Sequence, residues 1–200
     1  YVINTETDEI EREVILDQEP FGLEYNEETS KIYINNYYDG TVTVVDTEND
    51  YQTKLIKVGN DPVFLKVNSD LNKIYVLNKD DGTVSVINGQ NDEVEATLRT
   101  ETRPFFLTFN KRGDIFVANV LSHSISIFNK NNEPVATIKQ DGTVAWAPGK
   151  GPVKKGVAER VWQWVITSKK IIVGALIGII LIILGFIFWQ KRLKRIKAEL

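Results

Sequence analysis

Few residues of this 200-residue chain have the chemistry of a reactive site, and they do not form a set. His123 is the only histidine, and the absence of cysteine excludes disulfides, thiol catalysis and thiolate metal sites. Asp80 and Asp81 could suggest calcium, but they lack the spacing of a dedicated calcium loop. His123 could be a ligand or a proton carrier, yet without a Ser, Asp or Cys partner a turn residue is the simpler interpretation. Since HExxH, P-loop and GxGxxG motifs are also missing, we predict no catalytic, cofactor or metal site and no enzyme activity in these residues.

The elements that would position these residues recur along the chain. Residues 32–45, 74–87 and 115–128 read IYINNYYDGTVTVV, IYVLNKDDGTVSVI and IFVANVLSHSISIF, at offsets of 42 and 41 residues. Each stretch holds two strands around a tight turn, and each repeat has one more strand before and after it. This period and strand number predict an all-β fold, a β-propeller of four-stranded antiparallel blades.

The turn inside each repeat accounts for the candidate residues. Residues 39–40 and 81–82 are Asp-Gly, a favoured pair where a turn requires positive φ. In the third copy His123 stands where the glycine is expected, and we assign Asp80 and Asp81 to turn geometry. Three asparagines that recur at strand ends are assigned to turns as well: Asn36, Asn78 and Asn119.

These repeats resemble the YVTN-type β-propeller repeat of prokaryotic surface proteins. Residues 33–36 (YINN), 75–78 (YVLN) and 116–119 (FVAN) correspond to the family tetrapeptide. The segments TVTVVD, TVSVIN and SISIFN that follow are similar to the third strand of the family repeat. The similarity covers residues 1 to about 140 and implies a propeller fold, but one fold hosts many functions, so it implies no particular activity.

The register of the repeats predicts about three and a half blades: a half blade at 1–17 and full blades at 20–58, 62–100 and 104–140. Because closed rings have about four to eight blades, we expect further blades and a signal peptide upstream in a longer protein, or a second chain that completes the ring. Glu24, Lys66 and Thr108 share one register on the first strands and are expected to face the central channel. They differ in charge, so a structural role is favoured over a small-molecule or ion site.

After residue 140 the repeat stops. Residues 141–156 read as a Gly/Pro/Lys linker and residues 157–168 as a segment at the membrane interface. Residues 171–189 carry no charge and are long enough to approach the roughly 30 Å of bilayer hydrocarbon, so we predict a transmembrane α-helix over 169–190. The residues expected to anchor it at the two interfaces are Trp162, Trp164, Lys169, Lys170, Trp189, Lys191 and Arg192.

The ends of the predicted helix suggest its orientation, and its glycines suggest how it packs. The tail at 191–200 begins KRLKRIK, which favours a cytoplasmic C-terminus and therefore a propeller outside the cell membrane. Gly174 and Gly178 form a GxxxG motif, and Gly185 lies one heptad further. This stripe could admit a partner helix, or it could reflect ordinary glycine use in membrane helices.

The charge of the chain is divided between its two parts. Residues 169–200 carry seven Lys/Arg and one acid, so residues 1–168 have a net charge of −9, which repels phosphates and argues against nucleic acid as a partner. We predict a single-pass prokaryotic cell-membrane protein, with lipid around its helix and a propeller that is a non-catalytic binding or scaffolding module for protein partners. The alternatives are an accessory subunit of a membrane-bound enzyme complex and a propeller enzyme with its catalytic residues in further blades.

Overall fold

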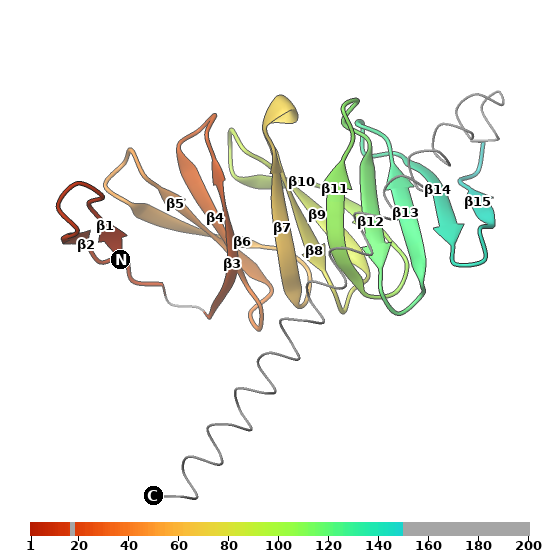
Figure 1. Cartoon of the computed structure of the whole chain (residues 1–200), viewed down its shortest axis with the longest axis horizontal. Helices are drawn as coiled ribbons and strands as arrows, with labels where there is room; N and C mark the ends of the chain where they lie inside the picture. The colour runs from red at the N-terminus through yellow and green to blue at the C-terminus, as the bar shows by residue number, and fades with distance from the viewer. Residues whose placement is uncertain (17–18, 150–200) are drawn as a thin grey trace, which may run out of the picture. The chain divides into compact units, whose positions relative to one another are not determined.

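The computed structural model describes residues 1–16 and 19–149, in which the strands form four antiparallel sheets (Figure 1). Three of the sheets are propeller-like blades whose strands are joined in sequence order, so each blade is a simple meander. Blade 1 contains β3 (Pro20–Asn26), β4 (Lys31–Asn36), β5 (Thr41–Asp46) and β6 (Gln52–Lys57). Blade 2 contains β7 (Pro62–Asn68), β8 (Lys73–Asn78), β9 (Thr83–Asn88) and β10 (Glu93–Arg99), with a 3-10 turn at Ser69–Leu71.

Blade 3 has one strand more than we predicted. It contains β11 (Pro104–Phe109), β12 (Ile115–Asn119), β13 (Ser124–Phe128), β14 (Pro134–Lys139) and β15 (Val144–Trp146). The predicted linker from residue 141 is therefore wrong for residues 144–146. Gly142 adopts a left-handed conformation (φ 84°) and Asp141 accepts a hydrogen bond from the backbone nitrogen of Thr143, which closes a hairpin and pairs β15 with β14.

The N-terminal hairpin consists of β1 (Val2–Ile3) and β2 (Ile10–Arg12). Within the described residues 1–16 of the half blade predicted at 1–17, these two short segments are the strands. Strand β2 ends at Arg12 because β1 offers only two residues for pairing, and Val2 is already the partner of Arg12. The Arg12 guanidinium binds the Asp50 carboxylate at 2.5 Å, which joins the hairpin to blade 1.

The blades pack through alternate faces of their strands. In β8, Ile74 and Val76 pack toward blade 1, whereas Tyr75 and Leu77 pack toward blade 3, as the two-residue period of a strand requires. Strand β7 lies between β3 and β11, so the first strands of the blades are neighbours (Figure 1). The core between blades 1 and 2 consists of Tyr33, Val42, Val44, Ile56, Leu65, Ile74, Val76 and Ile87. The core between blades 2 and 3 consists of Val63, Tyr75, Leu77, Val84, Val86, Leu98, Leu107, Ile115, Val117 and Phe128.

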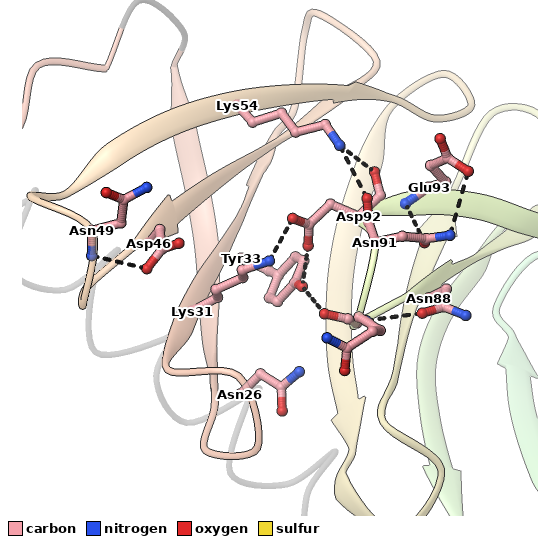
Figure 2. A network of polar contacts seen from close by, with 12 residues as sticks. Asn26, Lys31, Tyr33, Asp46, Asn49, Lys54, Asn88, Asn91, Asp92 and Glu93 are labelled. Atoms are coloured by element: carbon pink, nitrogen blue, oxygen red, sulfur yellow. Dashed lines mark hydrogen bonds and ion pairs between the residues drawn. The ribbon is translucent and has the colours of Figure 1, made fainter.

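A buried polar network also joins blades 1 and 2 (Figure 2). The turn between β9 and β10 carries Asp92, whose carboxylate accepts hydrogen bonds from the Tyr33 hydroxyl and the Lys31 ammonium, both at 2.6 Å. Lys54 donates to the backbone carbonyls of Asn91 and Asp92 in the same turn. Asp92 is only 9% exposed, so one buried carboxylate at a turn holds two residues of β4 in the neighbouring blade.

Membrane-spanning structure is not represented in the part of the chain that the structure describes. Within residues 1–16 and 19–149, no helix is long and apolar enough to cross a bilayer. The predicted interfacial segment (157–168), transmembrane helix (169–190) and tail (191–200) lie outside the described residues, as do residues 150–156 of the predicted linker.

Candidate ligand-binding site

A β-bulge opens the first strand of every blade. The register shifts between the proline that begins the strand and the second residue after it, in β3, β7 and β11 alike. The extra residues are Phe21, Val63 and Phe105. A bulge leaves its extra residue unpaired and turns its side chain relative to the regular pleat. Phe21 is 63% exposed and Phe105 38% exposed, so two of the three bulges present a phenylalanine to solvent.

The turns between the second and third strands lie at the same end of the blades. Pro20 is paired with Asn36, and Pro62 with Asn78, so the residues after these asparagines lie beside the bulges. In blade 1 these turn residues are Tyr37 and Tyr38, and in blade 2 the first is Lys79. The repeat therefore gathers bulge and turn side chains at one rim.

A depression of about 360 Å³ lies at this rim. Its volume is at the lower end of the roughly 300–1,000 Å³ typical of small-ligand sites. All three blades contribute to it, and its lining residues are Glu19, Pro20, Phe21, Tyr37, Tyr38, Val63, Lys79 and Phe105.

The walls of the depression are aromatic rings in contact with one another. Phe21 lies 5.6 Å from Tyr37 between ring centroids, and Tyr37 meets Tyr38 edge to face at 4.8 Å. On the other side Phe105 meets Phe106 edge to face at 5.1 Å. These spacings are those of favourable aromatic pairs, which hold the rings in place although Tyr38 is 74% exposed.

Lys79 supplies the one positive charge among the lining residues. Its ammonium donates hydrogen bonds to Tyr37 Oη at 2.6 Å and to Asp61 Oδ2 at 3.3 Å, and it lies 4.9 Å from the centroid of the Tyr37 ring. The hydrogen bond to Tyr37, and then the one to Asp61, raise the pKa of Lys79 above its ordinary value, against the opposing effect of partial burial. Lys79 is therefore a positioned cation and has no nucleophilic character.

The backbone around Lys79 is fixed by the connection between blades 1 and 2. Asp81 accepts hydrogen bonds from the backbone nitrogen and the side-chain amide of Asn60, both at 2.8 Å, and Lys79 N donates to the carbonyl of Asp61. Only glycine fits at position 59, because a Cβ atom there would lie 2.7 Å from Cγ of Asn78. The connection and the turn thus form one rigid support for the rim.

The structure assigns turn roles to the two acids and the histidine, as we predicted. Asp81 binds the Asn60 connection, and Asp80 lies 3.8 Å from the Lys79 ammonium. His123 is exposed and adopts φ 48°, close to the 62° and 63° of the two glycines at this turn position. Across residues 1–16 and 19–149, no group of three or more His, Cys, Asp or Glu residues could hold a metal ion.

The predicted channel-facing residues lie away from this depression. Glu24, Lys66 and Thr108 occupy one register on β3, β7 and β11, where their partners are Tyr33, Tyr75 and Phe116. Glu24 and Lys66 are half-buried and Thr108 is exposed. None of the three lines the depression, so a site at these residues would be distinct from the depression at the rim.

The three recurring asparagines have a more specific role than the turn role we predicted. The side-chain amide of Asn78 donates to the hydroxyls of Thr83 at 3.0 Å and Ser85 at 2.9 Å, on the third strand of its own blade. Asn36 binds two threonine hydroxyls in the same way in blade 1, and Asn119 binds two serine hydroxyls in blade 3. The hydroxyl face of the third strand is thus tied to the second strand.

The aromatic rim was missed by the sequence reasoning. Phe21 and Phe105 follow the prolines that open blades 1 and 3, and Tyr38 precedes an Asp-Gly turn, so each was treated as a strand or turn residue. A bulge cannot be seen in a sequence pattern, because it depends on the pairing of two strands. The signal that could have indicated the rim is a departure from the repeat. Lys79 stands at a turn position that is tyrosine in one of the other copies and valine in the other.

The residues predicted for membrane contact lie outside the described residues, and their roles stay predictions. They are Trp162, Trp164, Lys169, Lys170, Gly174, Gly178, Gly185, Trp189, Lys191 and Arg192.

Comparison with known proteins supports the propeller fold. Residues 18–160 match the family described as "YNCE-like beta-propeller". No curated protein is significantly similar in sequence. Among solved structures, hydrazine synthase of Kuenenia stuttgartiensis aligns over 66% of this chain and 39% of its own, with a TM-score of 0.56 and 22% identity.

Two further structures show the same fold at lower identity. AztD of Citrobacter koseri aligns with a TM-score of 0.55 and 16% identity over 67% of this chain and 38% of its own. The dihydro-heme d1 dehydrogenase NirN aligns with a TM-score of 0.58 and 16% identity over 68% and 32%. The chain thus spans about a third to two fifths of the length of these proteins. Enzymes are among them, so the likeness in fold leaves catalysis undecided.

Proposed function

Because the chain belongs to the YNCE-like β-propeller family, we propose that it is a binding module that receives a protein partner at the aromatic rim of its blades and is held at the cell surface by a membrane helix. The observation that carries the proposal is the depression lined by Phe21, Tyr37, Tyr38 and Phe105. Exposed aromatic side chains on a rigid support are the residues that most often anchor protein partners.

The chemistry of the rim favours binding over catalysis. Its polar lining residues are Glu19 and Lys79, with the phenols of Tyr37 and Tyr38. Lys79 is occupied by Tyr37 and Asp61, which leaves no paired acid and base or activated nucleophile among the lining residues. A binding module needs only shape, aromatic area and charge, all of which the rim has.

The membrane attachment in this proposal is supported by sequence alone. Residues 171–189 form an uncharged apolar run, and basic residues follow at 191–197. A helix of that length approaches the thickness of the bilayer hydrocarbon, and the basic cluster favours a cytoplasmic C-terminus. The blades would then face outward, where a partner can reach the rim.

Photo-crosslinking in intact cells tests the proposal. With a crosslinking amino acid at position 38, at the rim, we expect a discrete adduct that is weakened by Phe105→Ala. The matched control places the same group at Tyr25, which is 46% exposed on β3 but four residues beyond the bulge residue Phe21. Equal adducts from both positions, or none from position 38, would contradict the proposal.

The membrane part has its own readout in the same cells. We expect the chain to stay with the membrane fraction in alkaline carbonate and to be released by detergent. An externally added protease should reach the blades. Release into the soluble fraction by carbonate alone would show that residues 169–190 do not span the bilayer.

A further inference from the structure

The charges around the depression favour a positively charged ligand. Glu19 lines the depression, and Asp61 and Asp80 lie 3.3 Å and 3.8 Å from the Lys79 ammonium. Two carboxylates therefore flank the one ammonium, which is already paired, and Glu19 adds a third negative charge on the lining of the depression. An anion entering here would meet a net negative field, whereas a cation would be attracted.

Lys79 shows how the depression binds a cation. Its ammonium lies 4.9 Å from the centroid of the Tyr37 ring, inside the roughly 6 Å over which a ring attracts a cation, and it also donates to Tyr37 Oη and Asp61. The turn itself does not require lysine, because Tyr37 and Val120 occupy this position in the other blades. The Lys79 ammonium thus occupies the place beside the Tyr37 side chain that a cation from a ligand could otherwise take.

Much aromatic surface remains for a second cation. Tyr38 is 74% exposed, Phe21 63% and Phe105 38%, all on the lining of the same depression. A planar guanidinium stacks on such rings, and an ammonium binds to their faces.

We infer that the depression binds an Arg or Lys side chain of a basic protein partner, with Tyr38, Phe21 and Phe105 as the receiving rings and Lys79 as a built-in competitor. A protein source fits the net charge of −9 over residues 1–168, which attracts a basic polypeptide beyond the depression itself. The inference rests on the proposed binding function and adds the chemistry of the ligand.

The competitor role of Lys79 gives the sharpest test. The full chain in detergent is titrated with a hexa-arginine peptide at about 0.15 M salt, where charges beyond about 8 Å are screened. Lys79→Met frees the Tyr37 ring and the Asp61 carboxylate, so affinity should rise about fivefold. Tyr38→Ala and Phe105→Ala should each lower it about two- to fivefold, as expected for exposed cation–π contacts.

The controls separate a local effect from a change in total charge. Lys130→Met removes the same charge from an exposed side chain in the turn between β13 and β14, and should leave affinity unchanged. A thermal melt of each variant checks folding. An unchanged or lower affinity in Lys79→Met, with a wild-type melt, overturns the inference, as does tighter binding of hexa-glutamate than of hexa-arginine.

The two proposals fail in different ways. If position 38 yields a crosslinked partner that hexa-arginine does not displace, the binding function stands and the cationic ligand is wrong. If hexa-arginine binds as described but no partner is crosslinked, the function is wrong and the site chemistry stands. Binding to phosphocholine vesicles that is stronger than to the peptide would reassign the cation to a lipid headgroup and overturn the inference of a protein source.

Discussion

Asp92 and Asp50 occupy the same place in successive repeats but differ in their surroundings. Both lie in the turn after the third strand and adopt left-handed φ values of 57° and 52°. The Asp92 carboxylate is buried against Lys31 and Tyr33, whereas the Asp50 side chain is 73% exposed in its pair with Arg12. Comparing the two positions therefore isolates the effect of burial on the stability that an aspartate–cation pair contributes.

Replacing Asp92 with asparagine should destabilise the protein far more than the same change at Asp50. Asp92→Asn leaves Lys31 buried without its counter-charge, a loss of about 2–3 kcal/mol, while Asp50→Asn should cost less than about 1 kcal/mol. Asparagine tolerates the left-handed backbone, so neither change adds strain. Urea unfolding at pH 7 measures both, and equal losses would show that the buried network contributes nothing special.

Tyr75 should make the protein sensitive to alkaline pH. Burial, and to a smaller extent the charge of Glu95, raise the pKa of Tyr75 from 10.0 to about 12, so the folded state keeps a proton that the unfolded state loses. The stabilisation is complete below pH 10 and is lost as pH rises from 10 to about 12. The buried Tyr33 is shifted in the same direction, mainly by burial and then by its hydrogen bond to Asp92.

The free energy of unfolding of Tyr75→Phe should therefore fall less steeply between pH 10 and 12 than that of the wild type. At pH 8 it should already be weaker by about 1 kcal/mol, because the hydroxyl donates to Asn132 Oδ1 at 3.2 Å. Tyr38→Phe serves as the control, because it removes a phenol from a side chain that is 74% exposed. Parallel curves for wild type and Tyr75→Phe would contradict the assignment.

At the scale of elements, β15 shows how a short turn signal extends a sheet. Residues 141–143 repeat the Asp-Gly-Thr pattern of the inner turns, and the structure uses it to fold β15 back onto β14. The Gly/Pro/Lys-rich composition of the residues that follow led us to predict a linker instead. Three residues of strand are too few for a period to be recognised, so composition outweighed the turn signal.

Breaking this turn should expose the edge of β14 without unfolding the blades. Gly142→Val forces a β-branched residue to φ 84°, so the hydrogen bond from Lys139 N to Thr143 O should be lost. Hydrogen exchange should then accelerate at residues 135–139 and stay slow in β8 and β9. Gly149→Val is the control, with a similar φ of 75° outside the hairpin and open space around it; acceleration of β14 in the control would point to a general effect.

At the scale of the molecule, the fold could be predicted well and the candidate site poorly. The 42-residue offset of Pro20, Pro62 and Pro104 places the start of every first strand, because each repeat must bury the same residues against its neighbours. The rim could not be predicted in this way. Its rings come together from three blades through bulges and turns, and only the pairing of strands brings Phe21 and Phe105 to one depression.

The bulge also bears on how such a chain can diversify. Its extra residue has no partner in the ladder, so its identity can change without moving the register of the strand. The residue after the opening proline is phenylalanine in two copies and valine in the third, and the register shift is the same in all three. In blades 1 and 3 this position presents a phenylalanine to solvent, whereas Val63 in blade 2 is buried in the core, so each duplicated blade adds a bulge residue that either enlarges the exposed rim or packs inside.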